Sequence, residues 1–309
     1  MLSGRRRGSN RIGRALRELR SGTEVDSRVS SRFGRGGEFS ARVASTAGDR
    51  VAAWRLAYRE YRRMGFAEHD PLGLWYSLFD ALPRTTTILV EHGRALVGVV
   101  TVVPDSPMGL PADRTFPQEM RRLRRGSGQL AEAVSLVQAC EGARSGALVI
   151  SKLCELTCLC AERVLGAGAL AITVNPHHRG YYEKLMRFRT LASGRDCARV
   201  AGAPAVLMAL DFRDMAGHLA AARRARPART LYRRFMNDDE AGRTARHLAS
   251  RSRPLDPDAL REFFVTRRPL IPAAGRTARN LLAECYPECD LRSGPPAESN
   301  TTLALEAVK

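Results

Sequence analysis

Short apolar runs rich in β-branched residues alternate with helix-like segments between Thr85 and Leu210, and this alternation limits the possible folds. The first two runs are joined by Glu91-His92-Gly93-Arg94, a turn sequence that predicts a hairpin over Thr85–Val103. The pattern then predicts further elements in order: strand Leu130–Ala139, helix Leu148–Leu165, strand Ala169–Val174, helix Tyr181–Phe188 and strand Ala205–Leu210. Strands separated by helices predict an α/β (α+β) fold, with a mixed central sheet covered by helices.

The flanking segments differ in composition from this central part. Residues 1–47 are rich in Gly, Ser and Arg, and we expect a disordered basic tail there. A helix over Arg50–Met64 opens the folded domain, which we place at residues 48–212. We expect a helical C-terminal extension over residues 213–290 and a second disordered tail over residues 291–309.

The chain carries a formal net charge of +18, which raises the question of a nucleic-acid partner. All but three of its 50 basic residues are arginine, and the excess is spread along the chain. Residues 1–50 contain 12 basic and 5 acidic residues, and the later parts have similar surpluses. Without a single basic patch, the sequence argues against nucleic-acid binding and favours electrostatic attraction of an acidic partner.

Seven cysteines without a regular framework predict a protein of the reducing cytoplasm. Cys154, Cys158 and Cys160 share a helical segment and are expected to pack in the core, so we predict no metal site there. Cys285 and Cys289 flank a Tyr-Pro-Glu turn, and they could pair or bind a metal. No apolar run has the length of about 18 residues that a membrane-spanning helix needs.

Polar side chains gather where the strand Ala169–Val174 ends. Asn175 and His178 stand at the switch from strand to helix, and Tyr182 follows on that helix. Ligands of open α/β sheets bind at such strand ends. Glu132 occupies an otherwise apolar strand, where burial would raise the pKa of its carboxyl group. The sequence therefore indicates a polar site at one edge of an apolar core.

Several of these segments, taken in order, resemble one family. The chain is similar to the N-acyl amino acid synthases, which are GNAT-like acyltransferases related to acyl-homoserine lactone synthases. The resemblance covers roughly residues 50–212 and is carried by four stretches: Val97–Pro111, Ala131–Leu136, Thr173-Val-Asn-Pro-His-His178 with Tyr181-Tyr182, and Arg199–Val206.

The resemblance implies a GNAT-like acyltransferase domain at 48–212 and no permanently bound cofactor. It implies a long-chain acyl thioester donor, either acyl-acyl carrier protein or acyl-coenzyme A, and the amine of an amino acid as acceptor. The stretch Gln138–Gly146 departs from the GNAT pyrophosphate loop, although its glycines could still hold a phosphate. This departure favours acyl carrier protein as the partner that brings the acyl group.

The resemblance also implies roles for particular residues. Glu132 is expected to accept the amine proton or bind the amine, and Tyr182 to protonate the departing thiolate. The alternatives are that Glu132 pairs with an arginine, that Tyr182 only packs, and that Asn175 only caps a helix. The expected substrate-binding residues are Asn175, His178, Ser135 and Thr101.

Two features of the expected substrate pocket also follow from the resemblance. Ala57, Thr101 and Ser135 stand where the homoserine lactone branch is rich in arginine, which argues against S-adenosylmethionine as substrate. An acyl channel is expected along the first helix and along Trp75, Tyr76 and Phe79, although these residues could equally belong to the core.

Together these expectations describe a cytoplasmic, bacterial N-acyltransferase that transfers a long-chain acyl group to the amine of an amino acid or a similar small molecule. Two alternatives remain at this stage. One is a non-catalytic basic module that binds acyl carrier protein or nucleic acid, and the other is an acetyl-coenzyme A-dependent N-acetyltransferase.

Overall fold

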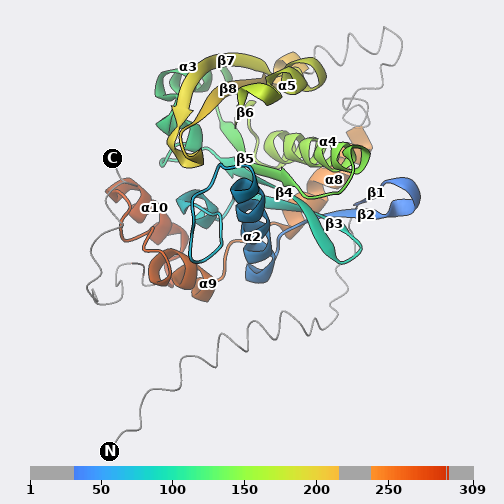
Figure 1. The fold of residues 1–309 in the computed structure, drawn as a ribbon. Coiled ribbons are helices and arrows are strands. Elements are labelled where there is room, and N and C mark those ends of the chain that lie inside the picture. The colour runs from blue at the N-terminus through green and yellow to red at the C-terminus, as the bar shows by residue number, and fades with distance from the viewer. Residues whose placement is uncertain (1–30, 216–237, 290, 292–309) are drawn as a thin grey trace, which may run out of the picture. The chain divides into compact units, whose positions relative to one another are not determined.

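The computed structural model describes residues 31–215, 238–289 and 291 (Figure 1). Within them, eight strands form one mixed sheet in the order β1-β2-β3-β4-β5-β6-β8-β7. Neighbouring strands are antiparallel except for β5 and β6, which are parallel. The strands are β1 (Ser31–Phe33), β2 (Phe39–Val43), β3 (Thr86–His92), β4 (Ala95–Pro104), β5 (Leu130–Gln138), β6 (Ala169–Val174), β7 (Arg189–Cys197) and β8 (Ala203–Asp211).

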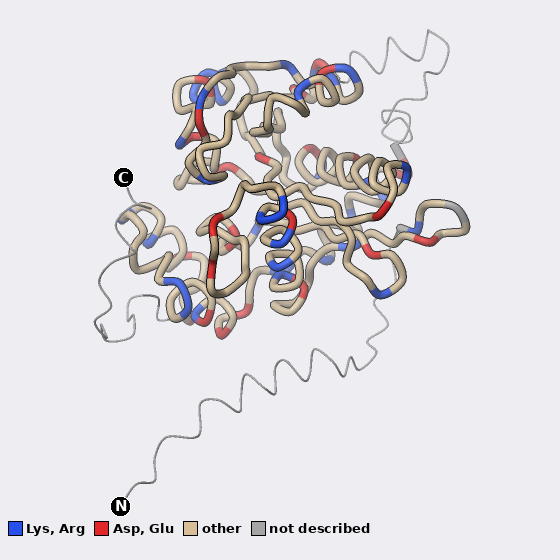
Figure 2. Tube along the Cα trace, viewed as in Figure 1, with Lys and Arg blue, Asp and Glu red and all other residues tan. Residues whose placement is uncertain are grey.

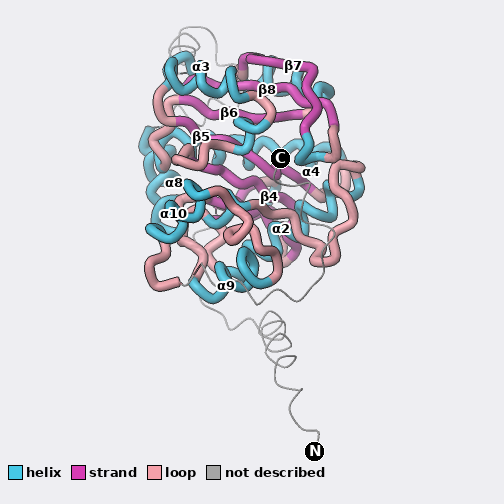
Figure 3. The backbone as a smooth tube through the Cα atoms, turned by 90° about the vertical axis from the view of Figure 1, so that its left-hand side faces the viewer, coloured by secondary structure: helices cyan, strands magenta, loops and turns pink. Residues whose placement is uncertain are grey.

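Helices cover both faces of this sheet (Figures 1 and 3), as the sequence predicts. One face packs against α4 (Ala143–Leu159), its continuation η4 (Cys160–Val164), α5 (Arg179–Met186) and α8 (Asp238–Arg251). The other face packs against α2 (Ala47–Arg63), α3 (Pro117–Ser127) and the C-terminal segments α9 (Pro257–Arg261), η7 (Glu262–Thr266) and α10 (Arg276–Cys285). We call these the α4 face and the α2 face. Five short 3-10 segments complete the described elements: η1 (Arg35–Gly37), η2 (Leu78–Ala81), η3 (Pro111–Arg114), η5 (Pro176–His178) and η6 (Ala198–Val200).

Local signals explain where α2 begins. The hydroxyl of Thr46 accepts a hydrogen bond from the backbone N–H of Asp49, and the Asp49 carboxylate accepts one from the backbone N–H of Thr46, both at 3.1 Å. This reciprocal capping satisfies N–H groups that a helix start leaves free. The helix ends before Gly65, whose φ of 76° suits glycine. The predicted helix Arg50–Met64 is therefore confirmed, with a start three residues earlier.

Helix α4 lies unusually close to the sheet because of a glycine in β4. A Cβ atom built on Gly98 would lie 2.6 Å from a methyl carbon of Val149, so a larger residue would push the helix away. The predicted helix Leu148–Leu165 is confirmed in position but begins earlier, at Ala143. Its last turn, η4, is a π-helix, a wider turn that often occurs at functional sites.

The prediction of a disordered tail over 1–47 is wrong for residues 31–47. Strands β1 and β2 extend the sheet beyond β3, and Phe33, Phe39 and Val43 are buried in the α4-face core. The composition hid them because the few apolar residues are separated by Gly, Arg and Ser. Residues 1–30 lie outside the described residues.

Strand β7 was not predicted from the sequence. Its text, Arg-Thr-Leu-Ala-Ser-Gly-Arg-Asp-Cys, contains two arginines, an aspartate and a glycine, and it lacks an apolar alternation. It pairs with β8 at the edge of the sheet, and the register shifts twice along the pair. An edge strand can carry polar residues because one of its sides faces no further strand.

The C-terminal extension is helical in its described part, as predicted, and it is packed against the α2 face. The Tyr286 hydroxyl donates to the carbonyl oxygen of Ala81 at 2.9 Å, and the Arg50 guanidinium donates to the carbonyl of Arg253 at 2.7 Å. Leu291, the first residue of the predicted second tail, is buried. The tail beyond Leu291 lies outside the described residues.

Charges of both signs are distributed along the described chain, as Figure 2 shows. Several arginines are bonded to carboxylates, such as Arg42 with Asp49 and Glu91. Arg124 and Arg195 are similarly bonded to acidic residues. Such pairing reduces the effective positive field over the described part. No helix among the described residues is long and apolar enough to cross a membrane.

Candidate active site

The two parallel strands at the centre of the sheet separate halfway along their length. The β5–β6 pairing runs from Leu130 opposite Ala169 to Ala133 opposite Ile172 and then stops. Beyond that point β5 stays paired with β4, and β6 with β8. We call the resulting gap in the β5–β6 pairing the strand opening. Backbone groups of β5 beyond Ala133 have no partner on β6, so they can bond to a ligand instead.

A bulge in β5 lies directly at the strand opening. Thr101 is opposite Val134 and Val99 is opposite Val137, so Ser135 and Leu136 together face one residue of β4. Ser135 has a φ of 56°, an uncommon conformation for a residue other than glycine. Strained backbone of this kind is concentrated at functional sites. The sequence does not signal this bulge, because serine is not a residue that favours it.

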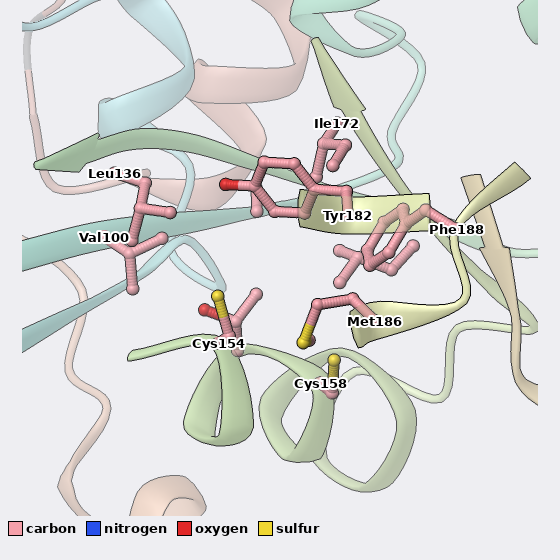
Figure 4. A pocket seen from close by; sticks show the side chains of 11 residues that line it. Val100, Leu136, Cys154, Cys158, Ile172, Tyr182, Met186 and Phe188 are labelled. Atoms are coloured by element: carbon pink, nitrogen blue, oxygen red, sulfur yellow. The ribbon is translucent and has the colours of Figure 1, made fainter. Parts of the chain in front are cut away.

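An apolar pocket borders the strand opening on the α4 face (Figure 4). The cavity is small, with a volume of about 20 Å³. Small-molecule pockets usually have roughly 300–1,000 Å³, so an acyl chain would need the wall side chains to move apart. The lining side chains come from three strands, two helices and the turn after α5: Val100, Ala133, Leu136, Cys154, Thr157, Cys158, Leu170, Ile172, Tyr182, Met186 and Phe188.

Tyr182 forms part of the wall of the apolar pocket. Its ring is 5.6 Å from that of Phe188, and its hydroxyl points toward Leu136 (Figure 4). Burial raises the pKa of Tyr182 well above its ordinary value, and Cys154, Tyr181 and Tyr61 add to the effect. The phenol therefore remains protonated at neutral pH. The neighbouring Tyr181 ring is perpendicular to it, and its hydroxyl lies near Ser151 and Cys154 of α4.

Glu132 lies in β5 with only 1% of its surface exposed. One carboxylate oxygen accepts a hydrogen bond of 2.8 Å from the backbone N–H of Ala112 in η3. Burial raises the pKa of Glu132 from 4.5 to about 7, although the Ala112 N–H and the positive charge of Arg199 act in the opposite direction. A carboxyl group with this pKa can accept or donate a proton near neutral pH.

A network of charges fixes the loop that holds Ala112. The Arg124 guanidinium binds the carboxylates of both Asp105 and Asp113, with nitrogen–oxygen distances of 3.0 and 2.7 Å. The Asp113 carboxylate in turn accepts from the backbone N–H of Leu110. The loop between β4 and α3 is thus tied down at both ends, and the N–H of Ala112 stays directed at Glu132.

Glu132 and Tyr182 approach the sheet from opposite faces. Side chains alternate along a strand, so Glu132 projects to the α2 face while Ala131 and Ala133 project to the α4 face. Tyr182 packs with the α4-face core, and Glu132 does not line the apolar pocket. Tyr61 of α2, on the other side of the sheet, contributes to the raised pKa of the Tyr182 phenol, so side chains from the two faces act on each other near the strand opening.

The other predicted substrate-binding residues are placed differently. The Thr101 hydroxyl is buried and hydrogen-bonded to the Thr87 hydroxyl at 3.1 Å, so it is not free for a ligand. The Asn175 carboxamide caps η5 by accepting from the backbone N–H of His177, which was the alternative considered for it. His178 is exposed and does not line the apolar pocket. Ser135 alone lies at the strand opening.

The predicted acyl channel along Trp75, Tyr76 and Phe79 does not coincide with the apolar pocket. Tyr76 stacks on Trp54 at 4.6 Å, its hydroxyl donates to the carbonyl of Phe263, and Phe79 is buried in the same α2-face core. Aromatic residues at helical spacing occur both in acyl channels and in hydrophobic cores, so the sequence could not distinguish the two roles. Here Tyr76 and Phe79 join the C-terminal extension to the sheet.

The described part of the chain contains no cluster of three or more residues suited to bind a metal. All seven cysteines are free, so Cys285 and Cys289 form no disulfide. Cys154 and Cys158 belong to the wall of the apolar pocket, and burial raises the pKa of both thiols. Cysteines of this kind pack as small apolar residues and are poor nucleophiles.

The geometry agrees with what comparison of the whole sequence reveals. The family model for the N-acyl amino acid synthase FeeM matches residues 52–211, just over half of the chain. The chain belongs to this family. It is an acyltransferase, as the resemblance implied, and its matched region contains Glu132, the β5 bulge and Tyr182.

Solved structures show the fold of the family. The chain is similar to FeeM, an N-acyl amino acid synthase from uncultured soil microbes, at 25% identity over 64% of this chain and 97% of that one, with a TM-score of 0.51. Weaker likenesses include an acetyltransferase of the GNAT family from Streptococcus pneumoniae (15% identity, 56% and 99% coverage, TM-score 0.40). They also include the coenzyme A-dependent acyl-homoserine lactone synthase BjaI, at 16% identity over 61% of this chain and 90% of that one, with a TM-score of 0.40. No curated protein matches the chain in sequence. The expected GNAT-like fold is confirmed.

Two residues near the strand opening were not identified as site residues from the sequence. Tyr61 of α2 lies on the helix along which the sequence placed an acyl channel or the core, and Arg199 of η6 was noted only as the start of a family-like stretch. The Arg199 charge lowers the pKa of Glu132 against the larger effect of burial, so the arginine acts electrostatically on this carboxyl group. One arginine among 47 gives no signal of its position until the fold is known.

The raised pKa of Glu132 predicts a pH-dependent stability. Folded protein holds the carboxyl proton more tightly than unfolded chain does, so this stabilisation is complete below pH 4.5 and is lost as the pH rises through about 7. Relative to Glu132→Gln, wild type should lose roughly 3 kcal/mol of unfolding free energy across that window. Urea denaturation of both proteins at pH 5 and pH 8 measures the difference. Parallel pH dependences of the two proteins would contradict the raised pKa.

Proposed function

We propose that this acyltransferase moves a long-chain acyl group from a thioester donor to the amine of an amino acid or a similar small molecule. The observation that carries the proposal is an apolar pocket on one side of the strand opening with a buried carboxyl group of raised pKa on the other. An acyl tail needs apolar surroundings and an amine needs polar ones, and the amine must reach the carbonyl carbon at the head of the tail.

The apolar pocket supports a fatty acyl donor over an acetyl donor. Its wall consists almost entirely of hydrocarbon and sulfur, and burying each methylene of a tail there is worth about 0.8 kcal/mol. The family relationship to an N-acyl amino acid synthase points in the same direction.

The proposed chemistry is aminolysis of a thioester. The neutral amine attacks the acyl carbonyl carbon, a new C–N bond forms, and the C–S bond breaks. Glu132 accepts the proton that the amine loses, directly or through one water, because its carboxylate is half-ionised near pH 7. The neutral phenol of Tyr182 donates a hydrogen bond to the departing sulfur, which leaves as a thiolate, while Glu132 keeps the proton of the amine until solvent takes it up.

Backbone groups at the strand opening complete this mechanism. The carbonyl oxygen gains negative charge during the attack, and N–H groups stabilise such a charge when they are already in place. Residues of β5 beyond Ala133 offer unpaired backbone on the side of β6. Ser135, at the bulge, is the side chain that we propose to contact the donor there.

The donor's phosphate-bearing arm is proposed to run along β5 toward the start of α4. That helix is 17 residues long, its N-cap is Gly142, and the exposed Arg144 stands in its first turn. A helix N-terminus favours an anion. Since the stretch before it lacks the GNAT pyrophosphate sequence, we propose acyl carrier protein, with its single phosphate, as the donor that this end accepts best.

The direct test measures free thiol and product together. Acyl carrier protein and coenzyme A thioesters from acetyl to palmitoyl are incubated with a mixture of amino acids, and the products are identified by mass spectrometry. We expect thiol release that depends on both substrates, long-chain N-acyl amino acids as products, and faster reaction with the carrier protein. Products limited to acetyl amides, or no thiol release with any pair, would refute the proposed function.

A further inference from the structure

A second group of side chains meets the strand opening from the α2 face. It consists of Tyr61 of α2, Trp75 in the loop after it and Arg199 of η6, and we call it the arginine–aromatic cluster. The Tyr61 and Trp75 rings meet edge to face at 4.7 Å. The guanidinium carbon of Arg199 lies 5.6 Å from the centre of the Trp75 ring. The fold therefore brings Arg199 of η6 to the aromatic pair formed by α2 and the loop that follows it.

Arg199 differs from Arg42, Arg124 and Arg195, which are partly buried and each bonded to carboxylates. Among the residues that the structure describes, Arg199 has no hydrogen-bond acceptor; it contacts the Trp75 ring, and its charge acts on Glu132 and Tyr61. A guanidinium has five N–H donors in a planar fork, which fits a carboxylate in a bidentate manner. Arg199 is thus held in place with its donors free.

Two unpaired polar atoms lie in the same part of the molecule. The indole N–H of Trp75, whose ring contacts Arg199, is buried and has no acceptor. The Thr173 hydroxyl is buried without a partner as well, and Thr173 lies on β6 one residue beyond the last residue that pairs with β5. Buried polar groups without partners are destabilising unless a ligand or water satisfies them, so these two atoms favour a polar ligand here.

The position of Arg199 relative to Glu132 limits what that ligand can be. The Arg199 charge acts on both Glu132 and Tyr61, lowering their pKa values against the larger effect of burial. An amine that gives its proton to Glu132 would have Arg199 close beside it. An α-amino acid carries its carboxylate on the same carbon as its amine, so both ends of one small molecule would be bound.

We propose that Arg199 binds the α-carboxylate of the acceptor and thereby selects amino acids over amines that lack a carboxylate. This rests on the proposed function and adds the residue that determines acceptor class. Arg199 orients the acceptor so that its amine faces the strand opening and Glu132. The apolar pocket on the other face then needs no contact with the acceptor. This role does not require the arginine-rich pocket that the resemblance ascribes to the homoserine lactone branch.

The test compares Arg199→Met with wild type on paired acceptors. Each pair is an amino acid and the amine obtained by its decarboxylation, and thiol release gives kcat/KM. Wild type should prefer the amino acid, and Arg199→Met should lose that preference by about tenfold or more, because a charged hydrogen bond contributes about 1.5–3 kcal/mol. Activity on the plain amine should stay within a factor of about two or three.

Arg195→Met is the matched control. Arg195 also lies over an aromatic ring, Phe116 at 5.0 Å, but its guanidinium is already bonded to Glu119 at 2.8 Å. Its loss should leave acceptor preference unchanged. Equal losses on both acceptors with Arg199→Met, or a rise in the donor KM in place of the acceptor KM, would overturn the assignment. The second result would mean that Arg199 binds the donor's phosphate.

Calorimetry separates failure of this inference from failure of the proposed function. An N-acyl glycine and the matching N-acyl methylamide are titrated into wild type and Arg199→Met. We expect wild type to bind the acid about tenfold more tightly, and the variant to bind both alike. Equal binding of both by wild type would overturn the carboxylate assignment even if thiol is released. Preferential binding of the acid without any thiol release would preserve the assignment and refute the transfer reaction.

Discussion

Glu132→Gln is expected to lower kcat/KM by a factor of about 10²–10⁴ while leaving the fold intact, since a positioned general base contributes an effect of that size. The amide has nearly the same shape, and its oxygen can still accept the hydrogen bond that Ala112 donates at 2.8 Å. What it cannot do is accept the proton of the attacking amine. Steady-state thiol release, together with circular dichroism of both proteins, measures the effect.

The pH dependence of the rate identifies the cause of that loss. In wild type, kcat/KM should rise with pH and reach half of its plateau near pH 7, because the base must be ionised and its pKa is about 7. The Gln variant should lose this step and keep only the titration of the amine substrate. Tyr182 contributes no falling limb in the accessible range, since its pKa lies well above the ordinary value.

Glu183→Gln serves as the control. Glu183 lies on α5 next to Tyr182, but its carboxylate is bonded to Arg179 and to the Thr190 hydroxyl, both at 2.8 Å. Its replacement should leave the pH profile unchanged. If Glu132→Gln retained most of the wild-type rate with the same midpoint, Glu132 would be a structural carboxylate that fixes the η3 loop, and the base would have to be sought elsewhere.

The opposite placement of Glu132 and Tyr182 is compatible with one reaction because the sheet is interrupted between them. A closed β5–β6 pair would separate the two side chains by a layer of backbone. The pairing instead stops at Ala133 and Ile172. The bulge at Ser135, just beyond this point along the strand, bends β5. Donor and acceptor can then enter from different faces and meet at the strand opening.

Elements with a clear apolar pattern could be predicted from the sequence. The hairpin β3–β4, strands β5, β6 and β8, and helices α2 and α4 are all found within a few residues of their predicted positions. Each buries a continuous stripe or run of apolar residues, which is the signal that sequence patterns carry. The burial of Glu132 could be predicted in the same way, since its neighbours Ala131 and Ala133 are apolar.

Features that depend on distant partners could not be predicted. Strands β1 and β2 gain their apolar surroundings from β3 and from the α4-face core, which includes α8, and β7 exists because β8 offers it a free edge. The proximity of Arg199 to Glu132 likewise depends on the turn between β7 and β8. The apolar pocket was sought along Tyr76 and Phe79, because spacing alone does not tell which face of the sheet an aromatic side chain covers.

The length of the acyl chain is expected to depend on Cys158, whose side chain lies in the wall of the apolar pocket. Cys158→Met adds two heavy atoms to a wall residue that is only 1% exposed, so the new side chain must occupy pocket space. Displacing about two methylenes of a tail, at about 0.8 kcal/mol each, should lower kcat/KM for the longest donors about tenfold relative to shorter ones. A donor series from octanoyl to palmitoyl measures the shift.

Cys160→Met is the control for this substitution, because Cys160 is also a fully buried cysteine at the end of the same helix but does not line the apolar pocket. Both variants should lose about 1–3 kcal/mol of stability from overpacking. Only Cys158→Met should change the preferred chain length, since only its added atoms compete with the tail. An unchanged length preference in Cys158→Met, with a stability loss equal to that of Cys160→Met, would show that the acyl chain binds elsewhere and that this cavity is a packing defect between α4 and α5.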